Sequence, residues 1–319
     1  MGNCFASFLG LKKRDNQRSD YQSTMATIKK VTSETEYTSM DISREFHSED
    51  KSTYWLPKDE EEQKRLTAQH FAFKELYGGN VLPSIIQNLD FEKGVTILDV
   101  GCGSGVWMMD MIYEYPNCTF YGCDIVNTVN RMLNLENFNF SYGNVVKGLP
   151  YPDNTFDFVH MRFFVLALRV DEWPLAVKEV IRVTKPRGFI QLSDIDGKLP
   201  KETSVAYHKL MSAIQTACDS RGQNAEMGKE LDNLVRENDN VKIVQADYRA
   251  CNLNENTAAA KKFVWDIVEG AKSMQPALGP LLGLRNKDDM DHFSKELKHC
   301  LETKESFFCL NSVAAQKIQ

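Results

Sequence analysis

The segment 95–105, VTILDVGCGSG, constrains the fold of this chain more than any other stretch of its sequence. Its first residues are apolar and partly β-branched, as in a strand buried inside a parallel sheet. Asp99 lies near the end of this strand, and three glycines follow at alternate positions. Glycine lets the backbone turn sharply and approach a ligand closely. Because residues 106–114 repeat apolar side chains at helical spacing, we predict a strand, a ligand-binding loop and a helix.

The spacing of the glycines and of two acids indicates the ligand. The pattern is Gly-x-Gly-x-Gly, whereas the dinucleotide fingerprint is Gly-x-Gly-x-x-Gly. A carboxylate at Asp99 suits the positive methionine end of S-adenosylmethionine better than it suits a pyrophosphate. Asp124 ends the next predicted strand, 119–123, where it can accept hydrogen bonds from both ribose hydroxyls. We therefore predict an S-adenosylmethionine site. A generic nucleotide-binding turn and a nicotinamide-dependent oxidoreductase remain the alternatives.

Strands and helices alternate from residue 95 onward, which is the pattern of a doubly wound parallel sheet in an α/β fold. Further strands are expected at 138–142, 156–160, 188–193, 241–247 and 306–314. Helices are expected at 59–77, 82–89, 172–183 and 203–217, and across 258–303 with a break around 276–280. We expect the helical segments within 54–77, 198–236 and 258–303 to cap the strand ends and to define an acceptor pocket.

Composition excludes several classes of function. The chain has 319 residues, enough for one large α/β domain with additions, and no apolar run approaches the ~20 residues of a membrane-spanning helix. Eight cysteines without a Cys-x-x-Cys pair disfavour a zinc site and a disulfide framework, and the histidines lack a metal-ligand spacing, so we expect no metal. The net charge of −6 makes a nucleic acid an unlikely partner.

The first 50 residues are polar and lack apolar periodicity, so we predict a disordered tail over 1–50 and one domain over 51–319. Gly2 is the residue that N-myristoylation requires, and Cys4 is a candidate for palmitoylation. Two acyl chains would hold the protein on a membrane surface. The alternative is a plain disordered start. The expected location is the cytoplasm, with membrane tethering through acylation, and the nucleus is the alternative.

Two loops at the predicted carboxyl ends of strands carry further candidates, because ligands in such sheets bind there. Asn144, beside Val145, offers a donor and an acceptor to the adenine edge, or it is an ordinary turn residue. His160 is a candidate general base or a hydrogen-bonded structural residue. Arg162 pairs a substrate carboxylate or forms a surface ion pair. Near Met161 the backbone can accept a hydrogen bond from the methionine ammonium.

Several runs of the sequence carry a family resemblance, namely LDVGCGSGVW, YGCDI, LPYPDNTFDFVHMRF and EVIRVTKPRGFIQL. Over residues 54–319 the chain resembles the class I S-adenosylmethionine-dependent methyltransferases. Its lead-in YWLPKDEEEQKRLTAQHFAF and its terminal run SFFCLNSVAAQK are similar to the fungal LaeA-like group, which is associated with the regulation of secondary metabolism.

The resemblance implies a seven-stranded Rossmann-like sheet of order 3-2-1-4-5-7-6, with strand 7 antiparallel, helical caps and the disordered tail. It also suggests Gln69 and His70 over the cofactor, as candidate substrate contacts. Two departures from the family pattern stand out: Arg187 replaces the first glycine of the usual Lys-Pro-Gly-Gly turn, and Asn144 replaces the usual acid of the adenine loop. The cofactor contacts expected from the loops and the resemblance are Asp99, Gly101, Cys102, Gly103, Asp124, Asn144, Val145 and Met161.

We therefore expect an enzyme that transfers a methyl group from S-adenosylmethionine to an acceptor, which is a small molecule, a lipid or a protein. Catalysis would rest mainly on alignment for in-line displacement, because the donor already carries a positive leaving group. The alternative is a regulator that holds the cofactor with little turnover. Asp194 and Asp196, at the end of the fifth predicted strand, face either the acceptor or solvent.

Overall fold

The computed structural model of this chain describes residues 45–46, 54–126, 136–203 and 205–319. Gly2, Cys4 and the predicted disordered tail lie outside the described residues, except for 45 and 46. Within the described ranges, no helix is long and apolar enough to cross a membrane.

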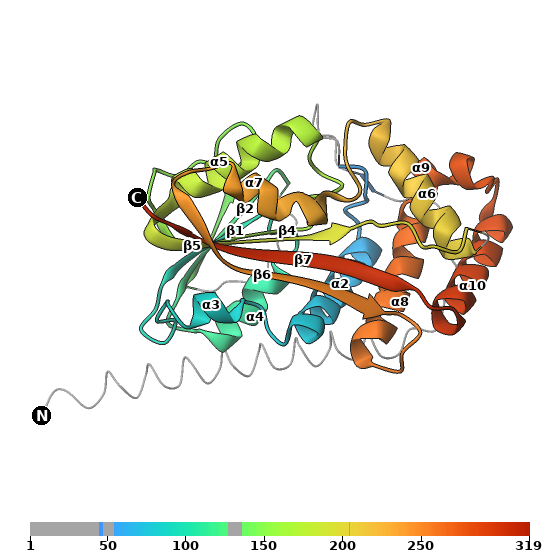
Figure 1. Cartoon of the computed structure of the whole chain (residues 1–319), viewed down its shortest axis with the longest axis horizontal. Coiled ribbons are helices and arrows are strands. Elements are labelled where there is room, and N and C mark those ends of the chain that lie inside the picture. The colour runs from blue at the N-terminus through green and yellow to red at the C-terminus, as the bar shows by residue number, and fades with distance from the viewer. Residues whose placement is uncertain (1–44, 47–53, 127–135, 204) are drawn as a thin grey trace, which may run out of the picture.

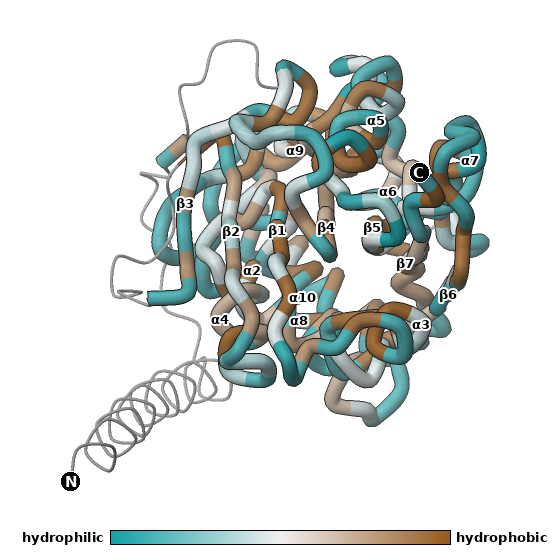
Figure 2. The backbone as a smooth tube through the Cα atoms, turned by 90° about the vertical axis from the view of Figure 1, so that its left-hand side faces the viewer, coloured by the Kyte–Doolittle hydropathy of each residue, from teal (hydrophilic) through white to brown (hydrophobic). Residues whose placement is uncertain are grey.

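The seven strands form one sheet in the order β3-β2-β1-β4-β5-β7-β6, which confirms the predicted topology. Neighbours from β3 to β5 are parallel, and β7 runs antiparallel to both β5 and β6. Figure 2 shows the strands side by side across the molecule. The strands are β1 (Thr96–Val100), β2 (Thr119–Asp124), β3 (Phe138–Tyr142), β4 (Phe156–Arg162), β5 (Thr184–Asp196), β6 (Val241–Asn252) and β7 (Phe307–Lys317).

Helices cover both faces of this sheet. Figure 1 shows α5 (Trp173–Val183) and α7 (Leu231–Arg236) on one side, and α3 (Pro83–Ile86) and α4 (Val106–Glu114) on the other. Successive residues of a strand point to opposite faces, so Leu98 joins the core under α5 and α7 while Ile97 joins the core under α3 and α4. Buried apolar residues on both faces explain why β1 is an almost continuous apolar run.

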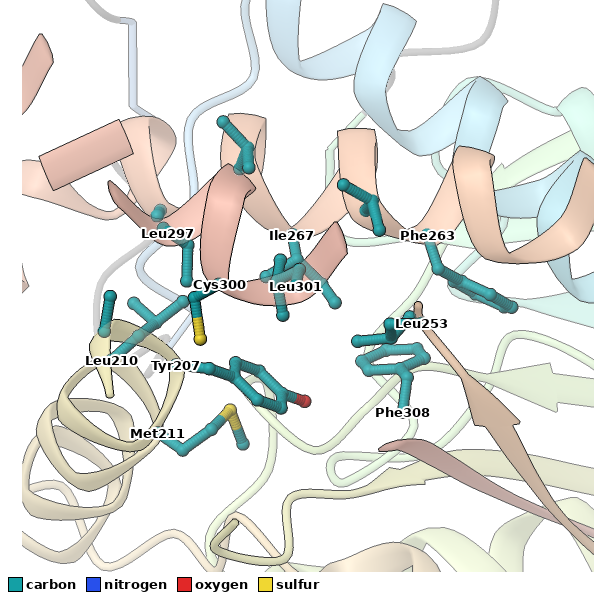
Figure 3. Packing of buried hydrophobic residues seen from close by; sticks show 14 of the residues in the cluster. Tyr207, Leu210, Met211, Leu253, Phe263, Ile267, Leu297, Cys300, Leu301 and Phe308 are labelled. Atoms are coloured by element: carbon teal, nitrogen blue, oxygen red, sulfur yellow. The ribbon is translucent and has the colours of Figure 1, made fainter. Parts of the chain in front are cut away.

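The remaining helices gather at one end of the molecule and form the cap, which we define as α2 (Glu60–Tyr77), α6 (Ala206–Asp219), α8 (Ala258–Ser273), α9 (Gln275–Leu282) and α10 (Lys287–Thr303). Apolar side chains from these helices share one core with the ends of β6 and β7. Figure 3 shows part of that core, in which Tyr207 lies between Met211 and the side chains of Ile267 and Leu301. Two short 3-10 helices, Val170–Glu172 and Met227–Glu230, precede α5 and α7.

The helical stretch 258–303 is interrupted as predicted, but at Met274 and at 283–286 and not within 276–280, through which α9 runs. Pro276 lies in the first turn of α9, where its missing N–H would have no intrahelical partner in any case. Pro280 lies inside the helix. The helix ends instead at Gly283, which adopts the left-handed conformation typical of a helix C-terminus.

Arg187, which departs from the family turn, keeps a left-handed backbone with φ of +67°. This conformation costs a residue with a side chain about 1–2 kcal/mol, and a glycine nothing. Its carbonyl accepts a hydrogen bond from Gln316 Nε2 at 3.1 Å, which ties the turn to β7. The turn therefore forms with arginine at a backbone conformation that favours glycine.

Candidate functional site

The loop between β1 and α4 folds back onto the end of β2. Gly101, Gly103 and Gly105 all have positive φ values, of +67°, +51° and +79°. The N–H of Gly101 donates to the carbonyl of Cys123 at 2.7 Å, which brings the loop onto the sheet. A Cβ at Gly101 would meet the ring of Phe164 at 2.4 Å, so only glycine fits there without moving that ring. The alternate glycines are therefore required by backbone conformation and close approach.

A hydrogen bond from His160 holds the side chain of Asp99 in place. His160 Nδ1–H donates to Asp99 Oδ1 at 2.8 Å, and its ring stacks on Trp107 with centroids 3.9 Å apart. Burial lowers the pKa of His160, although the bond to Asp99 opposes the change, so the ring is neutral near pH 7. His160 Nε2 is buried and has no hydrogen-bond partner among the described residues. This geometry favours the structural interpretation of His160, as a residue that positions Asp99.

Asp124 anchors the glycine loop. Its Oδ2 accepts a hydrogen bond from Gly103 N at 2.9 Å, and its Oδ1 accepts one from Val126 N at 3.0 Å. Each carboxylate oxygen has a further lone pair, which remains available to a hydroxyl. Burial raises the pKa of Asp124, and the backbone N–H groups around it oppose the rise. The carboxylate is thus fixed in orientation before any ligand arrives.

Asn144 makes the hydrogen bond expected of a turn residue, and its contact with adenine stays a prediction. Its Oδ1 accepts from Val146 N at 2.9 Å, which makes it a turn residue. Its Nδ2 carries no hydrogen bond to any described residue, so the side-chain amide can still donate to a ligand. The adjacent Val145 is buried beneath this turn.

These loops line one cavity, which we call the donor pocket, of about 1460 Å³ including its open mouth. Of the predicted site residues, nearly all lie in its wall: Gln69, Asp99, Gly101, Cys102, Gly103, Asp124, Asn144, Val145, His160 and Arg162. Met161 and His70 are not in the wall. The side chain of Met161 is buried in the core under α5 and α7, and the contact predicted for its backbone stays a prediction.

Arg162 occupies an unusual position for a cation. Its guanidinium lies 4.9 Å from the ring centroids of both Phe73 and Phe163, and its Nη2 donates to His70 Nδ1 at 3.1 Å. Its Nη1 is buried without a hydrogen-bond partner among the described residues. Burial lowers the pKa of Arg162 to about 10. The predicted surface ion pair is absent from the described residues, and the free Nη1 belongs to a side chain that lines the donor pocket.

His70 lies behind Arg162 and not over the pocket. Its side chain is fully buried, and its Nε2–H donates to Asp110 Oδ2 at 3.1 Å while Nδ1 accepts from Arg162. Lys74 and Asn80 also donate to Asp110 Oδ2, at 2.6 and 2.7 Å. The cluster fastens α2 to α4. We infer that His70 supports Arg162 and does not touch a ligand.

We expect His70 to make the protein sensitive to acid. Burial lowers the pKa of His70 to about 4, although the bond to Asp110 opposes the change. The unfolded chain takes up this proton near pH 6.5 and the folded chain only near pH 4, so this contribution to stability is complete above pH 6.5 and is lost as the pH falls. Between pH 7 and pH 4 the free energy of unfolding should fall by about 2–3 kcal/mol more in the wild type than in His70→Gln. Urea titrations at several pH values measure this; equal pH slopes for both proteins would contradict it.

Gln69 lies in the wall between the donor pocket and a second cavity. Its Nε2 donates to Asp266 Oδ2 at 3.0 Å, and the other oxygen of Asp266 accepts from Arg65 Nη1 at 2.6 Å. Arg65 also donates through Nη2 to Glu62 Oε1 at 2.5 Å. All four side chains are buried. The sequence analysis missed this network, although the spacing of Glu62, Arg65 and Gln69 places them along one face of a helix.

Asp194 and Asp196 are buried away from solvent, and neither of them lines the donor pocket or the second cavity. Asp194 Oδ2 accepts from the backbone N–H groups of Phe164 and Val165 at 2.6 and 3.0 Å. Burial raises the pKa of Asp194 to about 7, against these bonds. The residue therefore holds the loop after β4, which places the ring of Phe164 against Gly101.

The described residues contain no group of His, Cys, Asp and Glu side chains that could hold a metal ion. The donor pocket brings the carboxylates of Asp99 and Asp124, the amide of Asn144 and the guanidinium of Arg162 together around the glycine loop. These groups suit a ligand with hydroxyls, an adenine-like edge and an amino-acid end. Arg162 adds a buried N–H without a partner, and the glycine loop adds a bend that only glycine can form. These two features indicate the ligand more specifically than the fold does.

Comparison with known proteins gives a family match in the same region. A model described as "Methyltransferase domain" matches residues 91–240. The curated relatives include the "Secondary metabolism regulator laeA" of Coprinopsis cinerea, 30% identical over 157 residues, which are 48% of this chain and 38% of the relative. "Methyltransferase pytC" of Aspergillus terreus is 23% identical over 61% of this chain and 59% of its own length. "N-methyltransferase sirN" of Leptosphaeria maculans is 30% identical over 56% of this chain and 62% of its own length.

The chain thus spans about half the length of the curated relatives that it matches. Among solved structures, mycolic acid cyclopropane synthase CmaA1 complexed with SAH and CTAB is similar, with a TM-score of 0.50 and 17% identity. That likeness covers 73% of this chain and 81% of the synthase, and it concerns the fold alone.

Proposed function

We propose that this chain is an S-adenosylmethionine-dependent methyltransferase, and that its donor pocket presents the methyl group to an acceptor bound under the cap. The methyltransferase-domain model that matches residues 91–240 supports this assignment. The observation that carries the proposal is that one cavity joins the glycine loop, Asp99 and Asp124 to the wall of the cap at Gln69.

Each residue of the pocket would hold a different part of the donor. Asp124 would accept the ribose hydroxyls, and Asn144 Nδ2 would donate to the adenine edge. Asp99, fixed by His160, would face the positive methionine end, where the carboxylate stabilises positive charge. S-adenosylmethionine supplies a methyl group on a positive sulfur that leaves as a neutral thioether. The protein contributes alignment and exclusion of water, and a base is needed only where the acceptor must lose a proton.

Arg162 is the residue that we assign to the carboxylate of the donor, which revises the prediction of a substrate contact. A guanidinium whose Nη1 has no partner leaves a donor unsatisfied, and an anionic oxygen in the donor pocket would satisfy it. His70 and the two aromatic rings hold the guanidinium in place. A charge-assisted hydrogen bond of this kind is worth about 1.5–3 kcal/mol.

We expect Arg162→Leu to weaken S-adenosylmethionine binding about tenfold or more, and to leave the binding of decarboxylated S-adenosylmethionine within about twofold of wild type. Titration calorimetry with the two ligands measures the difference. Arg236→Leu, an exposed arginine of α7, is the matched control and should bind both ligands like wild type. Equal losses for the two ligands would remove Arg162 from the carboxylate.

Two measurements test the function as a whole. Calorimetry with S-adenosylmethionine and with NAD separates the methyltransferase from an oxidoreductase of similar fold, because NAD binding without S-adenosylmethionine binding would reject the proposal. A measurement of methyl transfer separates the enzyme from a regulator, the alternative that the name of the Coprinopsis cinerea relative supports. Cell extract incubated with methyl-labelled donor should gain label in the presence of this chain; tight donor binding with no transfer to any component would favour the regulator.

A further inference from the structure

A second cavity lies under the cap, beside the donor pocket, and we call it the cap chamber. It has a volume of about 890 Å³. Its wall is built from α2, α6, α8, the loop after β4 and the end of β5. It shares Tyr54, Leu66, Gln69 and Phe163 with the donor pocket. The two cavities are therefore neighbours across a wall of four side chains.

Apolar side chains dominate the wall of the cap chamber. Leu210, Met211 and Ile214 come from α6, and Ile267 and Met274 lie on or just after α8. Figure 3 shows Leu210 and Met211 on the same side as Tyr207, opposite Ile267. Burying an apolar ligand against such a wall is favourable by about 25 cal/mol per Å² of apolar surface removed from water.

The polar groups in the wall of the cap chamber are already paired. Asp266 accepts from Arg65 and Gln69, Arg65 also pairs with Glu62, and Tyr207 Oη donates to the carbonyl of Phe307 at 3.2 Å. No buried unpaired polar atom is found on any described residue of this wall, whereas the donor pocket has such atoms on Gln63, Trp107, His160 and Arg162. A charged guest would lose its hydration in the cap chamber without gaining an opposite charge.

One polar atom of the dividing wall is different. Gln69 uses its Nε2 to bind Asp266, and its Oε1 has no hydrogen-bond partner among the described residues. This carbonyl belongs to a side chain that lines both cavities, so it can accept a hydrogen bond from a hydroxyl or amino group near the dividing wall. The bond to Asp266 fixes which end of the amide is offered.

We propose that the cap chamber binds the methyl acceptor, and that the acceptor is an uncharged, largely apolar small molecule with one hydroxyl or amino group directed at Gln69. The inference rests on the proposed function. In the transfer, a lone pair of the acceptor oxygen or nitrogen forms a bond to the methyl carbon. The carbon–sulfur bond breaks with its electron pair on sulfur, and the proton of the acceptor leaves to water. A lysine or arginine side chain of a protein does not fit, because it would bring a positive charge into the chamber.

A pair of matched fluorescent probes tests the chemical class. N-phenyl-1-naphthylamine is apolar and has one N–H, and 8-anilino-1-naphthalenesulfonate adds one negative charge to the same rings. With the donor pocket filled by S-adenosylhomocysteine, we expect the neutral probe to bind at least about tenfold more tightly than the charged probe, because only the latter is desolvated without a partner. Equal binding of the two probes, or tighter binding of the sulfonate, would overturn the proposed class.

A filling variant tests the place of binding. Ile214→Trp puts a large ring into the cap chamber from α6, and Thr216→Trp puts the same ring on the exposed face of the same helix. Ile214→Trp should weaken the neutral probe about tenfold or more and leave S-adenosylhomocysteine binding within about twofold, whereas Thr216→Trp should change neither. Thermal unfolding of both variants confirms that they are folded. An unchanged probe affinity in a folded Ile214→Trp would overturn the assignment of the chamber.

Methyl-labelled donor in cell extract gives the last test. Label should appear in the fraction extracted by organic solvent, and this signal should be lost in Ile214→Trp and kept in Thr216→Trp. Label in precipitated protein would overturn the small-molecule acceptor while leaving methyl transfer intact. If no fraction gains label, the proposed function fails, and the probe experiments still decide whether the cap chamber is an apolar binding site.

Discussion

Arg65→Met is expected to lower the free energy of unfolding by about 3–5 kcal/mol, because it leaves two carboxylates buried without their cation. Glu62 is fully buried and Asp266 is 2% exposed, so neither carboxylate can recover its hydration in the folded chain. Arg65 bridges them, with N–O distances of 2.5 Å to Glu62 and 2.6 Å to Asp266. Methionine keeps most of the volume of the side chain, so the loss is electrostatic and not a matter of packing. Urea unfolding at neutral pH measures it.

The neighbouring residue provides the control. Lys64 pairs with Glu60 on the exposed side of the same helix, and Lys64→Met should cost less than about 1 kcal/mol. If Arg65→Met is too unstable to purify, the triple variant Glu62→Gln, Arg65→Met and Asp266→Asn should fold, because it removes the buried charges together. A loss for Arg65→Met no larger than that for Lys64→Met would contradict the electrostatic account.

Asp124→Ala is expected to weaken S-adenosylmethionine binding by about 1–3 kcal/mol, which is roughly 5- to 150-fold in the dissociation constant. Two effects add. The ribose hydroxyls lose their acceptor, and the N–H groups of Gly103 and Val126 lose theirs, which loosens the glycine loop. Titration calorimetry with S-adenosylmethionine measures the loss.

Asp124→Asn separates these two effects, because it keeps one carbonyl oxygen for the backbone while it removes the second acceptor. We expect an affinity between those of wild type and Asp124→Ala. Asp288→Ala, on the exposed first turn of α10, removes a carboxylate far along the chain and should bind the donor like wild type. Wild-type affinity in Asp124→Ala would take Asp124 out of the ribose site.

The sheet could be predicted because its signals are local. Alternating glycines after a buried strand, and acids at strand ends, depend on backbone conformation and on the shared edge of parallel strands, so they are visible in a short stretch of sequence. The order of the strands came from the family resemblance and not from any single strand. The lengths of β5, β6 and β7 were underestimated, since Thr184–Asp196, Val241–Asn252 and Phe307–Lys317 extend beyond the apolar runs. Antiparallel pairing with β7 sustains their polar ends.

The cap could be predicted only as a set of helices. Both Gln69 and His70 are expected over the cofactor from the sequence, but adjacent residues of a helix point about 100° apart. Gln69 therefore lines the pockets, and His70 binds Asp110 on α4. The ion pair of Arg65 with Asp266 joins residues 201 positions apart, and no local pattern announces such a contact. The cap chamber could not be predicted for the same reason, because its wall comes from helices that meet only in the folded chain.

The two anchors of α2 limit how the molecule can open. Helix α2 is bound to α4 through His70, Lys74 and Asp110. It is bound to α8 through Arg65 and Asp266. A hinge motion of α2 away from the sheet would have to break both of these desolvated charge clusters at once, at a cost of several kcal/mol. Helix α2 therefore stays in place between the two cavities, and ligands have to enter and leave beside it.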